Sequence, residues 1–144
     1  MNFLFLLTLA VLSGLAITLQ GQFMGLLDKG IGTKESIFIT YGIGGMIATL
    51  MMIITQGGNL RAWHGVPWYA FSAGALGLII VGTIGYVVPR LGLAPGFTLI
   101  VASQFISAVL IDHFGLFGAS VRTLDGTKLL GVAILMIGVW LIVK

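Results

Sequence analysis

The sequence has no cysteine and very little charge. Without cysteine the chain can form no disulfide and no thiolate metal site, so cysteine usage indicates no redox compartment. Only 8% of the 144 residues are charged, whereas a soluble domain has about one quarter. The charged side chains are therefore too few to cover a surface that faces water. Because hydrophobic residues make up 58% of the chain, we exclude a soluble globular domain and predict a protein that lies in a lipid bilayer.

The few charged residues are separated by long uncharged runs. These runs cover residues 1–27, 36–60, 62–89, 91–111 and 129–143. A helix that crosses a membrane needs roughly 20 apolar residues, so the runs predict five spanning helices, at residues 3–25, 36–56, 67–88, 95–114 and 127–143. The last run is short, but the side chains of Lys128 and Lys144 can reach the two interfaces.

We therefore predict an all-α integral membrane protein, with a single five-helix transmembrane domain over residues 1–144. For residues 1–17 a secretory signal peptide is the alternative to a first spanning helix. The lack of Lys or Arg before the apolar run, and the length of that run, favour the helix. The basic residues form no cluster, so we expect the lipid bilayer and not nucleic acid as a partner.

Turn-forming and charged residues predict where the helices end. The first connection is predicted from a group of such residues, Asp28, Lys29, Gly30, Gly32 and Lys34. Pro67 suits the first turn of the third helix, where its missing N–H costs nothing. Pro89 is predicted to stop that helix and Pro95 to begin the next.

Small residues recur on one face of two predicted helices. On the third helix these are Ala70, Gly74, Gly77, Val81 and Gly85, and on the second they are Thr40, Gly44 and Ala48. Helices in a bilayer associate through close packing because lipid tails are as apolar as leucine. We therefore expect these two helices to pack tightly against neighbours.

The basic residues hardly distinguish the two sides of the membrane. Five helices place Arg61, Arg122 and Lys128 on one side, and Lys29, Lys34, Arg90 and Lys144 on the other. An excess of Lys and Arg normally fixes the cytoplasmic side, and here the counts are nearly equal. Two interpretations stay open: the protein inserts in one weakly favoured orientation, or copies insert both ways round and form an antiparallel dimer. The dimer would be a ten-helix body with a two-fold axis in the membrane plane, a geometry that transporters use.

Three stretches carry a resemblance to a known family. They are Pro89-Arg90-Leu91-Gly92, then Val101-Ala102-Ser103-Gln104, then Leu110-Ile111-Asp112-His113-Phe114-Gly115. Together they resemble the YdcZ-type branch of the drug/metabolite transporter superfamily. Ser13-Gly14 leading to Leu19-Gln20 is similar to the first helix of that branch. The last helix, with Gly131 and Gly138 seven residues apart, resembles the final helix of the small multidrug resistance proteins.

The resemblance implies a small protein of the inner (plasma) membrane that works as an antiparallel pair with a second copy or a paralogue. By the same resemblance, Gly131 and Gly138 form the dimer contact. One departure matters. The small multidrug resistance proteins carry a glutamate in the middle of helix one, and this chain has no carboxylate between Met1 and Leu27. Their exchange mechanism therefore cannot be carried over.

Polar side chains within the predicted spans are the candidate substrate-binding residues, since polar groups in hydrocarbon are costly. Gln104 lies at the middle of the fourth helix, and Ser107 and Asp112 continue its face. Gln104 either lines a substrate path or bonds to a neighbouring helix as a packing contact. Gln20, late in the first helix, is a further candidate, and the ring of Tyr41 could stack on a ligand or on a cation.

Asp112 is predicted to be the only carboxylate near a membrane-embedded segment, because Asp28, Glu35 and Asp125 are placed in connections. If transport is coupled to protons, Asp112 is the candidate carrier. The alternative is a structural role, in which Asp112 accepts hydrogen bonds from backbone N–H groups or pairs with Arg122 or Arg90.

These features predict a transporter that moves a small organic solute by alternating access. A site of amides, hydroxyls and rings without a central charge favours neutral, zwitterionic or aromatic solutes. A passive small-ion channel and an accessory membrane subunit without transport activity are the alternatives. We expect no enzyme, cofactor or metal site, because His64 and His113 are far apart in the sequence and no catalytic set of side chains occurs within one span.

Overall fold

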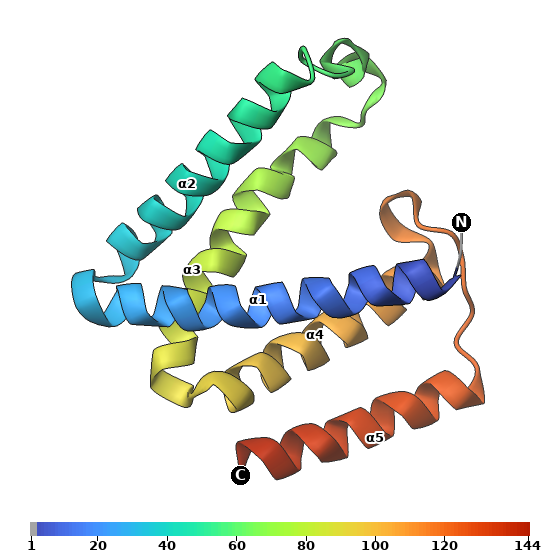
Figure 1. The fold of residues 1–144 in the computed structure, drawn as a ribbon. Coiled ribbons are helices and arrows are strands. Elements are labelled where there is room, and N and C mark those ends of the chain that lie inside the picture. The colour runs from blue at the N-terminus through green and yellow to red at the C-terminus, as the bar shows by residue number, and fades with distance from the viewer. Residues whose placement is uncertain (1–2) are drawn as a thin grey trace. The chain divides into compact units, whose positions relative to one another are not determined.

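The computed structural model describes residues 3–144, and it is built from α-helices joined by short connections. The five α-helices are α1 (Phe3–Ile31), α2 (Thr33–Ile54), α3 (Ala73–Leu91), α4 (Leu93–Phe114) and α5 (Gly126–Val143) (Figure 1). Three short 3₁₀ helices are η1 (Leu60–Gly65), η2 (Trp68–Ser72) and η3 (Leu116–Gly118). Within residues 3–144 there are five helical segments that are long and apolar enough to cross a membrane, the third of which runs from Trp68 to Leu91. The prediction of five spanning helices is confirmed at this level.

The first connection is much shorter than predicted. Helix α1 continues to Ile31 and α2 begins at Thr33, so only Gly32 separates them. The backbone of Gly32 has a φ of 104°, which a residue with a side chain rarely adopts. The placement of Asp28 in a connection was therefore wrong, as was that of Glu35, which lies in the first turn of α2. A single left-handed glycine reverses the chain where we expected a loop of several residues.

The chain also continues past the proline that was predicted to stop the third helix. Pro89 lies inside α3, which runs to Leu91, and Gly92 with a φ of 93° separates it from α4. A proline near the C-terminal end of a helix removes one backbone hydrogen bond and leaves the preceding turns intact. Gly92 therefore ends the helix, and Pro89 does not.

The start of the third spanning segment differs from the prediction in a similar way. Pro67 precedes the 3₁₀ helix η2, and the α-helix begins only at Ala73. The N–H of Ala70 donates to the carbonyl of Pro67 at 3.0 Å, and the hydroxyl of Ser72 donates to the carbonyl of Tyr69 at 2.6 Å. Such a side-chain bond competes with the backbone pattern of an α-helix. The tighter 3₁₀ geometry therefore persists up to Ser72.

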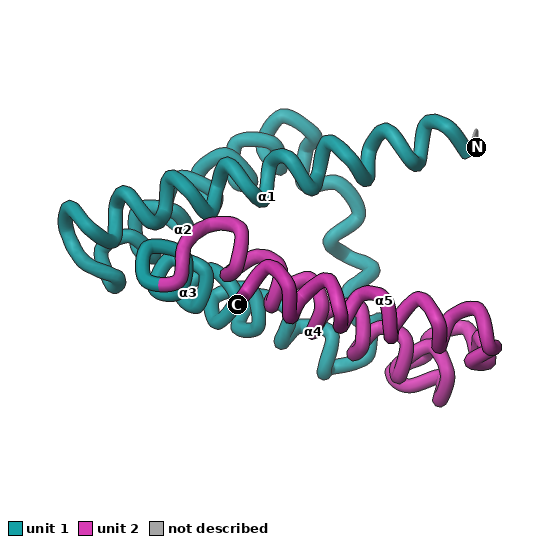
Figure 2. The backbone as a smooth tube through the Cα atoms, turned by 90° about the horizontal axis from the view of Figure 1, so that it is seen from below, with its two compact units in different colours: residues 1–90 teal, residues 91–144 magenta. Residues whose placement is uncertain are grey.

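The chain divides into two compact units, one up to Arg90 and one from Leu91 onward (Figure 2). In the first unit α2 and α3 run side by side, and α1 meets them at its C-terminal end (Figure 1). In the second unit α4 and α5 form a helical hairpin. The prediction of a single domain over residues 1–144 stays a prediction.

The buried residues of the first unit gather where α1 ends, α2 begins and α3 ends. They are Gly21, Met24, Gly25, Ser36, Ile84, Gly85 and Val88. Most other side chains are exposed, including large apolar ones along α1. A surface of this kind is unfavourable in water and suits contact with lipid tails. The hydrophobic surface is therefore directed outward, and the packed region is small.

Glycines permit the close approach of helices within this packed region. A Cβ added to Gly85 would lie 3.1 Å from the terminal methyl group of Met24, and one added to Gly82 would lie 3.0 Å from Cδ1 of Ile37. A Cβ on Gly25 would reach Pro89 and Val88 at 3.5 Å. We expected small residues on the third helix to allow tight packing. The contacts confirm this at Gly85, which belongs to the predicted face, and show the same at Gly82, which does not belong to it.

We expect Gly85→Leu to destabilise the first unit, because the added side chain collides with Met24 and, behind it, with Ser36, whose Oγ lies 3.9 Å from the position of the new Cβ. Overpacking of this kind costs about 1–3 kcal/mol. Gly74→Leu on the same helix is the matched control, since a Cβ there has nothing within 4 Å. Denaturant titration of both variants in detergent measures the free energy of unfolding. Equal values for the two variants would contradict the packing described for Gly85.

Candidate functional site

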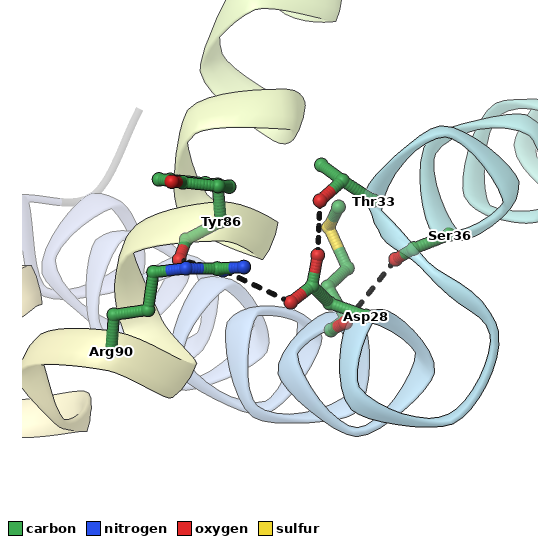
Figure 3. A network of polar contacts seen from close by, with 6 residues as sticks. Asp28, Thr33, Ser36, Tyr86 and Arg90 are labelled. Carbon is green, nitrogen blue, oxygen red and sulfur yellow. Dashed lines mark hydrogen bonds and ion pairs between the residues drawn. The ribbon is translucent and has the colours of Figure 1, made fainter.

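A polar network joins the three helices of the first unit at their common end (Figure 3). The hydroxyl of Thr33 donates to Oδ1 of Asp28, and Nη1 of Arg90 donates to Oδ2 of Asp28 at 3.1 Å. The guanidinium of Arg90 also donates to the carbonyl of Tyr86 at 2.7 Å, and it lies 3.6 Å from the centre of the Tyr86 ring. The hydroxyl of the fully buried Ser36 donates to the carbonyl of Met24 at 3.2 Å.

This network is structural in character. The side chain of Asp28 is only 5% exposed, whereas that of Arg90 is 47% exposed. A carboxylate that is withdrawn from solvent needs a charge partner and hydrogen bonds to both oxygens, and Thr33 and Arg90 supply them. Sequence reasoning missed this pair because it placed Asp28 in a loop and considered Arg90 as a partner for Asp112.

A hollow of about 400 Å³ lies on the first unit, and two of the predicted substrate-binding residues line it. Its lining comes from α1, α2 and α3: Gln20, Thr40, Tyr41, Gly44, Gly45, Ala48 and Val81. All three residues of the predicted small face of α2, Thr40, Gly44 and Ala48, belong to this lining. The structure therefore brings Gln20 and Tyr41 together, although they are 21 positions apart in the sequence.

The hollow lies near the middle of the helices that form it. At 1.5 Å per residue, Gln20 and Tyr41 are each within about 5 Å of the midpoint of their helix. Val81 is close to the middle of α3. If each helix crosses the bilayer, the hollow lies near the midplane, where transporters commonly place their substrate.

The polar groups of the hollow are not satisfied by the protein itself. Among residues 3–144, neither the amide of Gln20 nor the hydroxyl of Tyr41 has a hydrogen-bond partner. Both residues are exposed. A polar group in an apolar medium without a partner costs several kcal/mol. An occupant with its own hydrogen-bonding groups would remove that cost.

Gly77 makes room for Tyr41 at the edge of the hollow. A Cβ on Gly77 would collide with the Tyr41 hydroxyl, whereas it would lie 3.7 Å from Cζ of the ring. A methyl group at position 77 would therefore require the Tyr41 hydroxyl to move, whereas the rest of the ring leaves room for it. The sequence signal was the small face of the third helix, but its role in positioning Tyr41 was not predicted.

The other predicted site residues belong to the second unit. Gln104 and Ser107 are exposed on α4. They do not line the cavity of that unit, which includes Asp112. The carboxylate of Asp112 has no hydrogen-bond or ion-pair partner among residues 3–144, because Arg90 pairs with Asp28 and Arg122 contributes only its backbone N–H to the carbonyl of Asp112. The four-residue site formed by Gln20, Tyr41, Gln104 and Ser107 stays a prediction.

The two glycines predicted at the dimer contact lie on α5. Gly131 is exposed and Gly138 is half-buried. A Cβ at either position would have nothing within 4 Å. Packing within the chain therefore does not require glycine at these positions, and their role stays a prediction.

The chain is similar to known membrane proteins over nearly its whole length. Residues 5–141 match the family model described as "Putative inner membrane exporter, YdcZ". The inner membrane protein YdcZ of Escherichia coli (strain K12) is 26% identical over 148 aligned positions, which cover 96% of this chain and 95% of that protein. No solved structure matches the chain significantly. The family description names an exporter and not a class of enzyme.

We expect the effect of Gly77→Ala on stability to depend on Tyr41. Alanine normally favours a helix by about 1 kcal/mol over glycine, but here its methyl group meets the Tyr41 hydroxyl. In the Tyr41→Phe background the nearest ring atom is 3.7 Å away, so the methyl group is accommodated. A double-mutant cycle by denaturant titration should give a coupling free energy of about 1–2 kcal/mol.

The matched control for this cycle is Gly44→Ala, which also lies at the hollow but has nothing within 4 Å of its Cβ. Its effect should be the same with Tyr41 and with Tyr41→Phe. A Gly77→Ala effect that is equally independent of Tyr41 would show that the hydroxyl does not occupy the place of that methyl group.

Proposed function

This chain belongs to the YdcZ family of inner membrane exporters, and on that premise we propose that it moves a small organic solute across the inner membrane by alternating access. It is an inner membrane protein, and residues 3–144 contain five helices able to span the bilayer. The proposal adds the mechanism, the class of solute and the antiparallel pairing to that family assignment.

The observation that carries the proposal is the hollow at the middle of the first unit. It is lined by the amide of Gln20 and the phenol of Tyr41, neither of which has a hydrogen-bond partner among residues 3–144. Thr40, which directly precedes Tyr41 in the sequence, adds a hydroxyl group. A membrane protein has little reason to keep such groups at mid-helix unless something binds them. Substrate binding is the use that fits an exporter family.

The lining favours an uncharged or zwitterionic solute with an aromatic or apolar part. No Asp, Glu, Lys or Arg lines the hollow, so it offers hydrogen bonds without a net charge. Tyr41 adds a ring that can stack on an aromatic group. Gln104 and Ser107 of α4, whose amide and hydroxyl groups are exposed, stay proposed substrate-binding residues of the second unit.

We propose that the working unit is an antiparallel pair with a second copy or a paralogue. The supporting observation is the near balance of basic residues, with three on one side of the predicted topology and four on the other. Gly131 and Gly138 are the proposed contact on α5, since within residues 3–144 no atom lies within 4 Å of a Cβ added to either glycine. Small residues of this kind permit close helix pairing in lipid.

Asp112 is the proposed coupling residue. Its carboxylate lies two residues, about half a turn, before the end of α4 and has no hydrogen-bond or ion-pair partner among residues 3–144. Coupling through Asp112 would make flux depend on pH, and Asp112→Asn would remove that dependence.

We expect Gln20→Leu to reduce transport strongly, because it removes the amide from the hollow. Losing a hydrogen bond from a desolvated site costs roughly 1–3 kcal/mol, or about 5–150-fold in rate or affinity. The measurement is uptake of radiolabelled phenylalanine, tryptophan and nicotinamide into proteoliposomes that contain the purified protein. Gln22→Leu is the matched control, since Gln22 is exposed on α1 and does not line the hollow.

Three outcomes would contradict the proposed site or the proposed function. Equal loss in the Gln20 and Gln22 variants would show that the hollow is not the site. A single-channel current above about 10⁶ ions per second would indicate a passive channel, because alternating access on a μs–ms timescale cannot reach that rate. Protein that moves none of the probes and binds another membrane protein instead would indicate an accessory subunit.

We expect cysteines introduced at Lys29 and, separately, at Arg61 each to be labelled in part by a membrane-impermeant maleimide on intact cells. Lys29 is exposed in the last turn of α1 and Arg61 is exposed in η1, so the two positions lie beyond opposite ends of α2. The chain has no native cysteine that would add background. Partial labelling at both positions follows from insertion in two orientations. Complete labelling in permeabilised cells is the control for accessibility, and labelling of only one position in intact cells would establish a single orientation.

A further inference from the structure

The second unit has a small cavity that is lined by residues of both charges. The proposed transport uses only one of them, Asp112. It has a volume of about 200 Å³ and lies where α4 ends and α5 begins. Its lining is Phe105, Ala108, Val109, Asp112, Arg122 and Lys128. This is smaller than the roughly 300–1,000 Å³ of most small-molecule sites, so the cavity suits one end of a molecule and not a whole solute.

Three hydrogen bonds donated by backbone N–H groups hold the connection between α4 and α5 in place. The N–H of Arg122 donates to the carbonyl of Asp112 at 2.9 Å, and the N–H of Leu124 donates to Nδ1 of His113 at 3.3 Å. At the start of α5 the side chain of Asp125 accepts from the N–H of Lys128 at 2.8 Å. Hydrogen bonds therefore join the connection to both helices, and the cavity is part of the helical hairpin.

The charges in the cavity do not neutralise one another. Asp112 and Arg122 form no ion pair, and among residues 3–144 neither side chain has a hydrogen-bond partner. The ammonium group of Lys128 donates to the carbonyl of Thr123 at 2.8 Å and has two further N–H donors. The cavity therefore presents one carboxylate and two cationic groups, a pattern that matches a ligand with both a negative and a positive group.

The cavity also changes character with depth along α4. Asp112 lies near the helix end, whereas Phe105, Ala108 and Val109 lie one to two turns toward the middle of the span. Seven residues from Asp112 to Phe105 correspond to about 10 Å along the helix. In a membrane the charged end would lie at the headgroup level and the apolar end among the acyl chains.

We propose that this cavity binds the headgroup of a phospholipid that carries both a phosphate and a primary ammonium group, as phosphatidylethanolamine does. The phosphate lies between Arg122 and Lys128, and the ammonium group donates to the carboxylate of Asp112. The start of the acyl chains rests on Phe105 and Val109. This binding uses neither the hollow of the first unit nor any solute, but it shares Asp112 with the proposed coupling.

The charge pattern also predicts which lipids are rejected. Phosphatidylglycerol has a phosphate but no ammonium group, so it leaves the carboxylate of Asp112 without a cation. Phosphatidylcholine has a trimethylated nitrogen with no N–H to donate. Selectivity for the ethanolamine headgroup therefore depends on Asp112, whereas overall retention depends on Arg122.

The test is native mass spectrometry of the purified full-length protein after exchange into vesicles with equal amounts of the three lipids and matched acyl chains. The unaltered protein should retain phosphatidylethanolamine over the other two. Arg122→Gln should lower lipid retention about tenfold, the size expected for one charge-assisted hydrogen bond. Asp112→Asn should reverse the preference toward phosphatidylglycerol, because the cavity then has only cationic groups. Arg61→Gln, a change at an exposed arginine of η1, is the matched control and should alter neither property.

The preference is a ratio among lipids in one sample, so a partly misfolded variant cannot produce its reversal. Equal retention of the three lipids by the unaltered protein, or an unchanged preference in Asp112→Asn, would overturn the proposal. Displacement of the lipid by water-soluble phosphoethanolamine would also overturn it, since the ligand would then be a free solute. Loss of pH-dependent flux in Asp112→Asn with the lipid preference intact would assign Asp112 to coupling alone.

Discussion

A polar side chain in a bilayer must find a partner, and this constraint sorts the polar residues of the chain into two groups. Asp28 and Arg90 satisfy one another, with Thr33 on the second carboxylate oxygen. Gln20 and Tyr41 have no partner among residues 3–144. The satisfied group holds three helices together, whereas the unsatisfied group requires something from outside the first unit. Because water is not available at mid-membrane to hydrogen-bond these groups, the difference between the two groups is what supports the proposed site at Gln20 and Tyr41.

The glycines divide in the same way. Gly85 and Gly77 are needed by neighbours inside the first unit, where a methyl group would meet Met24 or the hydroxyl of Tyr41. Glycines such as Gly131 on α5 have open space beside them. In hydrocarbon, close packing replaces the hydrophobic effect as the force between helices, so an open glycine marks a surface that can still pack. The sequence shows glycines of both kinds alike, and only the contacts distinguish them.

The number of spans was predictable from the sequence because hydropathy over about 20 residues depends little on detail. Some helix ends were predictable too, such as the end of α4 at Phe114 and the end of α5 at Val143, but the turns at Gly32 and Gly92 were not. Charged residues near a connection were assigned to it, yet Asp28 is helical because a single glycine with positive φ, Gly32, makes the whole turn. Pro89 failed as a stop signal because a proline in the last turn removes only one hydrogen bond. Each error came from a local backbone property that composition does not carry.

The candidate site was predictable in parts. Gln20 and Tyr41 were chosen one at a time for being polar or aromatic within an apolar span, and the sequence held no sign that they share one hollow. Their meeting depends on how α1 and α2 turn at Gly32 and on the space that Gly77 leaves. That two distant residues line one hollow depends on how the helices pack, and the pattern of the sequence does not show this.

The packing of the first unit is uneven, and this bears on how it could move. Among the described residues, its buried positions lie between the middle of α1 and α3 and the end where Asp28 pairs with Arg90, whereas η1 and η2 at the other end of α2 and α3 bury none. Local opening costs least where few contacts are lost. A change of access would therefore separate the helices at the η1 and η2 end and keep the Asp28–Arg90 end as the pivot. The hollow with Gln20 and Tyr41 lies between these two ends, so it would open toward one side of the membrane while staying closed at the other. In the proposed antiparallel pair, the inverted copy would have its loosely packed end on the opposite side of the membrane. Each copy would then open toward a different side, so the pair would alternate access with one kind of hinge.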